Sequence, residues 1–486
     1  MKVISFLSAA LVILSCQSNK QEKRSTDPFR PQFHFSPPSG WMNDPNGMFY
    51  YEGEYHLFYQ HYPDSTVWGA MHWGHAVSKD LMHWEHLPIA LYPDSIGYIF
   101  SGSAVVDTSN TSGFGTKENP PIVAVFTYHN MDGEKSGRND FQIQGIAYSL
   151  DKGRTWTKYK DNPVLKNPGI KDFRDPKVAW NAVANQWVMT LAVKDHIEFY
   201  GSPDLKHWEK LSEFGQTLGA HGGVWECPDL FLLKDEAGNP HWVLLVSIGS
   251  AGPQGGSATQ YFVGDFDGKN FIAQDSTTRW IDYGADNYAG VTWSDVPAED
   301  GRRLFMGWMS NWQYAQVVPA TTWRSAMTLP REVSLKQTMS GLQLFSKSAR
   351  EVKKLFDEGE CFNEPNTFDG PVVINFGVLE SQTIAFELSN GEGEKVSITL
   401  EKGVLSFDRV KSGISNFHVG FPSVHKVELG DIKVSSVEIY VDASSIEVFV
   451  NNGELVMTEL VFPTVPYNKV ALVKPETGYC IRSIIH

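Results

Sequence analysis

Short apolar runs separated by turn residues dominate the pattern along this chain. Residues 55–62, 122–128, 187–193 and 242–248 combine aromatic and β-branched residues in the way that is typical of β-strands. Few stretches repeat apolar residues at the helical spacing of three and four positions. The pattern therefore predicts an all-β protein.

A short motif recurs along the first part of the chain. Residues 78–84 read SKDLMHW and residues 202–208 read SPDLKHW, and looser copies occupy residues 149–156 and 264–271. Each copy follows an apolar strand and places Ser or Asp turn chemistry shortly before an aromatic residue. Repeats that each close a hairpin are typical of a β-propeller, in which several small sheets surround an axis. We expect the aspartates of these repeats to stabilise turns and to take no part in catalysis.

The pattern changes near residues 328–332. Beyond this point most tryptophans disappear, and apolar and polar residues alternate. The alternation is regular over residues 383–388, 396–400, 437–441 and 445–450. Strands with one apolar and one polar face are typical of an antiparallel sandwich. We therefore predict a β-propeller over residues 31–335 and a β-sandwich over residues 336–486.

The composition fits a soluble globular protein that is large enough for two domains. The chain has 486 residues, of which 42% are hydrophobic and 20% are charged. Its formal net charge of −15 argues against nucleic-acid binding, which needs a basic surface, and favours an uncharged or cationic partner. Aromatic residues reach 13%. Such rings fill protein cores and also pack on the apolar faces of sugars.

The N-terminus has the pattern of an export signal. Lys2 precedes an apolar run over residues 3–14, and a cysteine and a polar stretch follow. The run is too short to cross a bilayer as a mature helix, and no later segment looks transmembrane. The residues around Cys16 resemble a bacterial lipoprotein processing site. We predict a signal peptide over residues 1–16, a lipid on Cys16 and a polar tether over residues 17–30, which would anchor the protein in a bacterial cell envelope, periplasmic or at the cell surface. The alternative is an ordinary signal peptide with an incidental cysteine.

Three acidic residues lie close to a proline in similar settings. Asp44 lies within Trp41-Met42-Asn43-Asp44-Pro45-Asn46-Gly47, Asp175 directly precedes a proline, and Glu226 is followed by Cys227 and a proline. The residue before a proline favours extended geometry. We therefore expect Asp44 to end a strand and Asn46-Gly47 to form a turn before the next strand.

Carboxylates of this kind can meet in a propeller, because the inner strands of different blades converge on a central funnel. Hydrolysis of a glycosidic bond needs two carboxyl groups, one to protonate the departing oxygen and one to act as nucleophile or base. A third can hold the sugar hydroxyls next to the developing positive charge. Each acid taken alone could equally form a turn or a salt bridge, and it is the occurrence of three that indicates catalysis.

The three motifs resemble, in order, the signature motifs of glycoside hydrolase family 32, the family of invertases, inulinases and levanases. The resemblance covers essentially the whole mature chain and implies a five-bladed β-propeller followed by a β-sandwich. It implies Asp44 as nucleophile, Glu226 as general acid and base, and Asp175 as the residue that stabilises the transition state through fructosyl hydroxyls. It also implies a sugar pocket lined by Asn43, Gln60, Trp68, Phe100, Ser101 and Arg174, with Asp286 and Trp308 as further candidates.

The cysteines and histidines favour structural roles over metal binding. We interpret Cys227 as tuning the adjacent acid and not as a nucleophile. One disulfide, between Cys361 and Cys480, is compatible with the three cysteines of the mature chain beyond Cys16. His72 and His75 have a His-x-x-His spacing, but no third ligand stands near them in the sequence. We expect neither a metal nor a cofactor.

These features together predict an exported retaining β-fructosidase that trims fructose from the ends of fructans. Levan, inulin and sucrose are all candidate substrates, no nucleic acid is expected as a partner, and the membrane is reached only through the lipid anchor. Two alternatives stay open: a transfructosylase, in which a sugar hydroxyl replaces water, and a non-catalytic fructan-binding lipoprotein. The carboxylates favour an enzyme, because a binding protein needs no acid–base pair.

Overall fold

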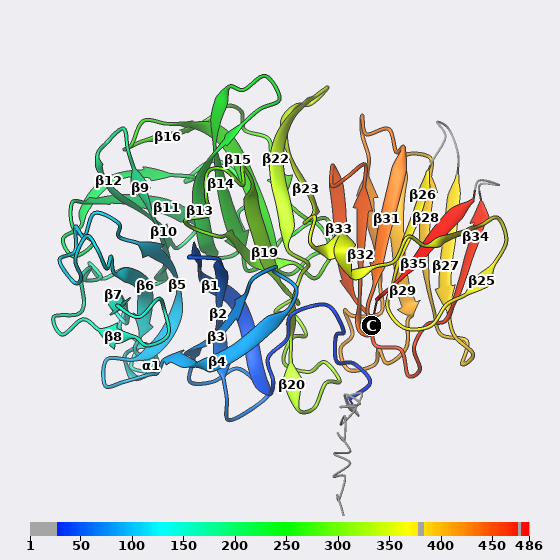
Figure 1. Cartoon of the computed structure of the whole chain (residues 1–486), viewed down its shortest axis with the longest axis horizontal. Helices are drawn as coiled ribbons and strands as arrows, with labels where there is room; N and C mark the ends of the chain where they lie inside the picture. The colour runs from blue at the N-terminus through cyan, green and yellow to red at the C-terminus, as the bar shows by residue number, and fades with distance from the viewer. Residues whose placement is uncertain (1–26, 378–382, 475–477, 486) are drawn as a thin grey trace, which may run out of the picture.

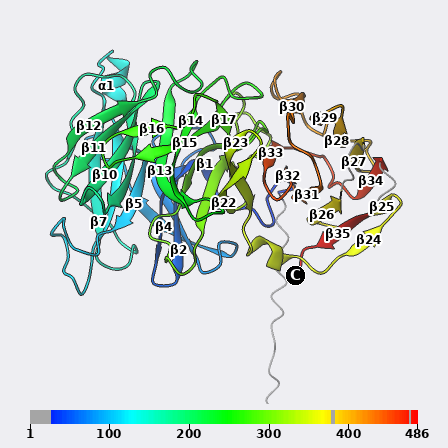
Figure 2. The ribbon, with the colours of Figure 1, turned by 90° about the horizontal axis from the view of Figure 1, so that it is seen from above.

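The computed structural model describes residues 27–377, 383–474 and 478–485, and these residues form mostly β-strands. Figure 1 shows two bodies side by side, the first blue to yellow-green and the second yellow to red, and Figure 2 shows the same division from above. The helices among these residues are α1 (Met131–Lys135) and the 3-10 helix η1 (Val352–Leu355). None of the described helices has the length and apolar character needed to span a membrane.

Five sheets form the first body. Within each sheet the main strands lie side by side in the order of the sequence, and each pairs antiparallel with the next. The first sheet contains β1 (Gly40–Tyr51), β2 (Glu54–Tyr62), β3 (His72–Ser78), β4 (Trp84–Leu91) and, parallel to β1, β20 (Trp323–Arg324). The second contains β5 (Tyr98–Val106), β6 (Ile122–His129), β7 (Gln142–Ser149) and β8 (Thr157–Lys158). The third contains β9 (Phe173–Asn181), β10 (Gln186–Val193), β11 (His196–Ser202) and β12 (Glu209–Phe214). The fourth contains β13 (Trp225–Lys234), β14 (Pro240–Ile248), β15 (Ala258–Phe266), β16 (Phe271–Ala273) and β17 (Arg279–Trp280). The fifth contains β18 (Tyr288–Thr292), β19 (Arg303–Met309), β21 (Ala326–Met327), β22 (Arg331–Thr338) and β23 (Gly341–Ser348).

The five sheets are the blades of a propeller. Their innermost strands β1, β5, β9, β13 and β18 contact one another in that order, and β18 contacts β1. Strand β20 follows β19 of the fifth blade in the sequence, yet it pairs with β1 and so joins the last part of the propeller to its first blade. The predicted five-bladed propeller is confirmed.

The recurring motif closes the hairpin between the third and fourth strands of a blade. In the first copy, Asp80 accepts hydrogen bonds from the backbone N–H groups of Met82 and His83, and the indole of Trp84 donates to the Leu81 carbonyl. The second copy repeats these contacts around Asp204. The looser copies occupy the same hairpins, β7–β8 and β15–β16. The prediction that these aspartates stabilise turns is confirmed.

Each innermost strand carries a β-bulge near its first residues. The register shifts lie at Met42–Pro45 in β1, Ile99–Gly102 in β5, Arg174–Lys177 in β9, Glu226–Asp229 in β13 and Tyr288–Val291 in β18. A bulge bends the strand locally and redirects the side chains beside it. All five blades are therefore distorted at the same end of the funnel.

Strand β1 runs without a break from Gly40 to Tyr51, so the predicted strand end at Asp44 and the turn at Asn46-Gly47 are wrong. Pro45 lacks an N–H group, and a bulge is a place within a strand where that loss is tolerated. Gly47 has a φ of 55°, and a Cβ atom there would lie 2.6 Å from the Trp73 ring. The turn-forming residues thus produce a bulged strand that packs closely on its neighbours.

Two six-stranded sheets form the second body, the predicted sandwich. One contains β24 (Glu360–Phe362), β35 (Tyr479–Ser483), β26 (Val372–Gly377), β31 (Ser436–Val441), β32 (Ser445–Val450) and β33 (Leu455–Leu460). The other contains β25 (Asn366–Thr367), β34 (Lys469–Lys474), β27 (Ile384–Ser389), β28 (Lys395–Glu401), β29 (Val404–Lys411) and β30 (Val424–Glu428). Their inward apolar residues form one core, and a disulfide between Cys361 and Cys480 joins β24 to β35, as the sequence allowed.

The predicted domain boundary at residue 335 falls inside β22. Strands β22 and β23 pair with each other, and β22 pairs with β19, so the fifth blade extends to Ser348. The alternating pattern of these two strands resembles that of the sandwich because an outer blade strand also buries one face and exposes the other. We therefore propose that the two units divide after Ser348.

A buried ionic contact joins the two units. The Arg331 guanidinium, from the propeller, lies 2.5 Å from Glu447 of the sandwich and 3.0 Å from Asp282, and these three side chains are at most 2% exposed. Loss of one partner would leave an uncompensated buried charge, which typically costs about 3–5 kcal/mol. The contact therefore restricts how the sandwich can sit on the propeller.

His34 connects the segment that precedes β1 to the sandwich. Its two ring nitrogens lie 2.8 Å from Asp442 and 2.9 Å from Glu447, and all three side chains are fully buried. Burial by itself lowers the pKa of His34, but hydrogen bonds with the two carboxylates raise it to about 9. His34 is therefore an imidazolium at neutral pH.

We expect the free energy of unfolding to fall as the pH rises from about 6.5 to about 9. Below about 6.5, the ordinary pKa of histidine, folded and unfolded chains both carry the proton and the stabilisation is fully present. Above that pH the unfolded chain releases the proton, whereas the folded chain keeps it until the pH passes about 9. The loss amounts to at most about 3.5 kcal/mol, at about 1.4 kcal/mol per pH unit. Urea unfolding at several pH values should show this loss of unfolding free energy in the wild type and not in His34→Gln. Parallel plots of unfolding free energy against pH for the two proteins would contradict the prediction.

Candidate active site

A pocket of about 240 Å³ opens where the bulged ends of the innermost strands meet. The bulges bring together side chains from four blades and from the connections between strands. The lining residues are Asn43, Asp44, Gln60, Trp68, Phe100, Ser101, His129, Glu134, Gln142, Asp172, Arg174, Asp175, Glu226 and Trp312. All three predicted catalytic carboxylates therefore face one cavity.

Asp44, on β1, is surrounded by hydrogen-bond donors. The Ser101 hydroxyl donates to its Oδ2 atom at 2.7 Å, and the Asn43 amide donates to its Oδ1 atom at 3.0 Å. Burial and the negative charge of Glu226 raise the pKa of Asp44, while these donors act in the opposite direction. The donors favour a carboxylate that is available to attack an electrophilic carbon.

Glu226, on β13, is held from two sides. Arg174 donates to its Oε1 atom through Nε and Nη2, at 3.1 and 2.9 Å. The Tyr288 hydroxyl donates to its Oε2 atom. Burial and the charge of Glu226 raise the pKa of Tyr288 well above its usual value, so the phenol keeps its proton and remains a donor. Tyr288, at the start of β18, was not identified from the sequence.

Asp175, on β9, is the most deeply buried of the three carboxylates. Its Oδ2 atom accepts from the backbone N–H of Cys227 at 3.0 Å and lies 4.0 Å from Arg174 Nε. Burial raises the pKa of Asp175 to about 7, although Arg174 acts against the shift. The φ angles of Asp175 and Cys227 are 65° and 43°. Non-glycine residues with such angles carry backbone strain and are often found at functional sites.

The Cys227 thiol contacts the other two carboxylates and not the predicted acid. Its Sγ atom lies 3.4 Å from Asp44 Oδ2 and 3.7 Å from Asp175 Oδ2. Burial and the surrounding negative charges raise the pKa of Cys227 well above its usual value, so it remains a neutral thiol. A neutral thiol is a weak nucleophile, and the contacts of Cys227 with Asp44 and Asp175 differ from the interpretation that it tunes Glu226.

The remaining residues implied by the resemblance divide into two groups. Asn43, Gln60, Trp68, Phe100, Ser101 and Arg174 line the pocket as expected. Asn43 is oriented by the indole of Trp41, which donates to its Oδ1 atom at 2.7 Å. Trp68 and Phe100 meet edge to face, with ring centroids 6.1 Å apart, and form an aromatic wall.

Asp286 does not belong to the pocket, which corrects the expectation from the sequence. Its Oδ2 atom lies 2.7 Å from Arg409 of the sandwich, and its Oδ1 atom accepts from the Tyr314 hydroxyl at 2.6 Å. Asp286 precedes β18 and faces the neighbouring body, so its carboxylate joins the two units. Like several pocket residues, Asp286 stands next to the start of an inner strand. Its side chain points toward the sandwich because its ionic partner Arg409 lies there.

Trp308 is likewise not a lining residue. It is fully buried and packs against both Trp41 and Trp312, at centroid distances of 6.0 and 4.8 Å. Trp312 reaches the pocket in its place. Trp308 lies within β19, the second strand of its blade, and packs behind Trp312, which follows the end of that strand.

Four polar lining residues were not identified from the sequence: His129, Glu134, Gln142 and Asp172. His129 ends β6 and Gln142 begins β7, and the two are paired across the sheet. The sequence feature that could have indicated them is a pair of polar residues at the adjoining ends of two neighbouring strands. Glu134 lies on α1, in the connection between these strands, and no periodic pattern points to it.

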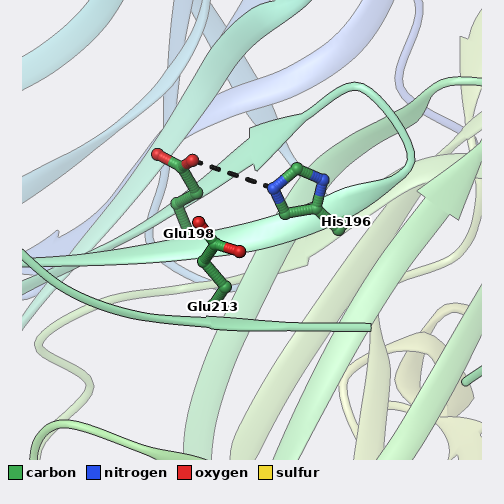
Figure 3. Close-up of side chains that lie close together, drawn as sticks. All are labelled: His196, Glu198 and Glu213. Carbon is green, nitrogen blue, oxygen red and sulfur yellow. Dashed lines mark ion pairs between the residues drawn. The ribbon is translucent and has the colours of Figure 1, made fainter. Parts of the chain in front are cut away.

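One cluster outside the pocket offers three potential metal ligands among the described residues: His196, Glu198 and Glu213 (Figure 3). The Lys210 ammonium lies 2.6 Å from Glu198 and also pairs with Glu213. The two carboxylates therefore already share a cation, and the cluster fits a structural ion-pair network better than a metal site. Cys16, the predicted lipidation site, lies outside the described residues.

Comparison with known proteins gives consistent matches over nearly the whole chain. The family model of the glycosyl hydrolases family 32 N-terminal domain matches residues 34–348, and that of the family 32 C-terminal domain matches residues 340–483. A levanase from Bacillus subtilis is 46% identical over 487 aligned residues, which cover 94% of this chain and 70% of the levanase. An extracellular exo-inulinase from Aspergillus awamori is 37% identical, with 94% of each chain covered. The crystal structure of exo-inulinase from Aspergillus awamori superposes with a TM-score of 0.86 at 35% identity, covering 95% of this chain and 99% of the other.

Proposed function

The chain belongs to glycosyl hydrolases family 32 and is a glycoside hydrolase of the β-fructofuranosidase type, and from this premise we propose that it hydrolyses fructosyl linkages of fructans with retention of configuration. The observation that carries the proposal is that Asp44 and Glu226 share one small pocket in different surroundings. Retaining glycosidases use two carboxyl groups, one as nucleophile and the other first as acid and then as base.

Asp44 is the nucleophile in this proposal. Its carboxylate attacks the anomeric carbon of the fructosyl unit and forms a covalent intermediate. The hydroxyl of Ser101 and the amide of Asn43 hold it in one orientation, so little reorganisation precedes the attack.

Glu226 is the general acid and base. In its protonated form it donates to the oxygen of the leaving sugar, and as a carboxylate it then takes a proton from the water that attacks the intermediate. The guanidinium of Arg174 and the hydroxyl of Tyr288 hold Glu226 in place through both steps. Asp175 is the stabilising residue: it accepts from fructosyl hydroxyls and strengthens that contact as positive charge develops on the ring.

The size of the pocket supports attack at chain ends. Its volume of about 240 Å³ lies below the range of about 300–1,000 Å³ that is usual for ligand sites. Such a cavity suits one terminal fructosyl unit better than the middle of a polymer. The similar protein from Aspergillus awamori is named an exo-inulinase.

The products formed in the first minutes test this proposal. Purified enzyme incubated with levan, inulin or sucrose should release free fructose, and with the polymers fructose alone should appear at early times. A ladder of oligosaccharides before fructose would contradict attack at chain ends. Products longer than the substrate would favour transfer over hydrolysis, and no cleavage of any of the three sugars would contradict the proposed function.

Export from the cytoplasm is supported by two observations. Cys361 and Cys480 form a disulfide, and structural disulfides persist mainly in oxidising compartments. One of the similar proteins is named an extracellular enzyme. Anchoring through a lipid on Cys16 stays a prediction from the sequence.

A further inference from the structure

Glu134 reaches the pocket from its rim and is held there by a buried histidine. It lies on α1, and its side chain is 42% exposed, whereas that of His129 is 4% exposed. The His129 Nε2 atom lies 3.0 Å from Glu134 Oε2. The Glu134 side chain lines the cavity, and its other carboxylate oxygen, Oε1, has no hydrogen-bond partner among the described residues.

The direction of the hydrogen bond to Glu134 follows from the network behind it. The Gln142 Oε1 atom accepts from the backbone N–H of Phe173 at 2.8 Å, which directs the Gln142 amide nitrogen toward His129. That amide donates to His129 Nδ1 at 3.2 Å, so Nδ1 is an acceptor and Nε2 carries the proton. Burial lowers the pKa of His129, which favours this neutral form. His129 therefore donates to Glu134 and fixes the orientation of its carboxylate.

The same network connects Glu134 to the side of the pocket where the leaving sugar must lie. Arg174 donates to Glu226, to Asp172 and, at 3.4 Å, to Gln142. The leaving oxygen receives its proton from Glu226, so the sugar that departs lies on this side. The neighbours of Asp44, by contrast, are Asn43, Ser101 and Cys227.

Exposure orders these carboxylates from the bottom of the pocket to its rim. The side chains of Asp175, Glu226 and Glu134 are 5%, 22% and 42% exposed. In the proposed reaction, the fructosyl unit that is cleaved occupies the deep end, next to Asp175. A sugar attached to it extends past Glu226 toward the rim, where Glu134 offers a fixed acceptor with a free oxygen. Asp172, whose Oδ1 atom is held by Arg174 at 2.7 Å, is 21% exposed and offers a second acceptor at the level of Glu226.

We propose that Glu134, fixed by His129, accepts hydrogen bonds from the hydroxyl groups of the leaving sugar and thereby determines how well the enzyme discriminates between leaving groups. The proposal rests on the proposed hydrolysis of fructosides. Carboxylate acceptors suit this task because sugar hydroxyls are donors, and a hydrogen bond to a charged group is stronger than one between neutral groups.

Two substrates that differ only in the leaving group test the proposal. A fructo-oligosaccharide has a leaving sugar with hydroxyl groups, and p-nitrophenyl β-fructofuranoside does not. In Glu134→Gln, the ratio of kcat/KM for the oligosaccharide to kcat/KM for the nitrophenyl substrate should fall by about 10-fold, mainly through KM for the oligosaccharide. Asp132→Asn removes the same charge from the same helix at an exposed position that does not line the pocket, and this control should keep the wild-type ratio.

Each other outcome would overturn the proposal. An unchanged ratio in Glu134→Gln would mean that Glu134 makes no contact with the leaving sugar. An equal loss on both substrates would mean that it acts on the fructosyl unit or on the fold. A similar fall in the Asp132→Asn control would assign the effect to the charge of α1 as a whole. If the wild type cleaves neither substrate, the proposed function itself fails, and this result is distinct from the first three.

Discussion

Replacing Asp44 by asparagine should lower kcat on fructans by about four to six orders of magnitude, the usual cost of losing a catalytic nucleophile. The amide has nearly the same shape but cannot form the covalent intermediate, so the first chemical step is lost. Binding should survive, because Asn43, Gln60 and Trp68 still line the pocket. Initial rates of fructose release from levan or inulin, measured at high enzyme concentration, give the comparison.

The fold of this variant should be intact, and its stability equal to or above that of the wild type. Burial and the charge of Glu226 raise the pKa of Asp44, so the carboxylate is held at an energetic cost that a neutral amide relieves. Circular dichroism and thermal unfolding check this. Asp64→Asn, at an exposed position beyond β2, is the matched control and should keep full activity. A folded Asp44→Asn protein with more than about one hundredth of wild-type activity would exclude Asp44 as the nucleophile.

Replacing Glu226 by alanine should lower kcat/KM on fructans by about three to five orders of magnitude, and by much less on p-nitrophenyl β-fructofuranoside. A sugar alkoxide is a poor leaving group and needs the proton that Glu226 supplies. Nitrophenolate is stable without that proton, so the first step tolerates the loss of the acid. The second step still lacks its base, and the covalent intermediate should therefore accumulate, which rapid mixing would show as a burst of nitrophenol.

The matched comparison for this variant is Tyr288→Phe, which removes only the hydroxyl that donates to Glu226. It should lose far less activity than Glu226→Ala, because the carboxyl group and its contact with Arg174 remain. An equal loss on the two substrates in Glu226→Ala would show that this residue does not protonate the leaving group.

Much of this fold and site could be predicted from the sequence because it depends on contacts between residues that are close along the chain. The repeated Ser-x-Asp turn before an aromatic residue depends on contacts within seven residues, such as Asp80 with His83, so the sequence alone reveals the hairpins that close the blades. The three carboxylates are marked by their own neighbours, a proline or a cysteine beside each. The sandwich strands were predicted from the alternation of apolar and polar residues, which is expected of a strand with one buried and one exposed face.

Residues whose role depends on distant partners were misjudged or not identified. Asp286 and Trp308 stand at positions that resemble those of pocket residues, but Asp286 turns to Arg409 of the sandwich and Trp308 packs behind Trp312. Tyr288 becomes important only because β18 lies beside β13, which brings its hydroxyl to Glu226.

The sequence by itself determined that the chain is all-β, where the turns of the repeats lie and which three carboxylates share a similar local setting, because these features depend on neighbours along the chain. The tertiary structure alone decided which side chains face the pocket. A bulge redirects every side chain beside it, and its position depends on pairing with a second strand, as in β1, where turn-forming residues sit inside a continuous strand. Glu134 illustrates the same limit: it reaches the pocket only because His129 and Gln142, thirteen residues apart, pair across two strands and hold it there.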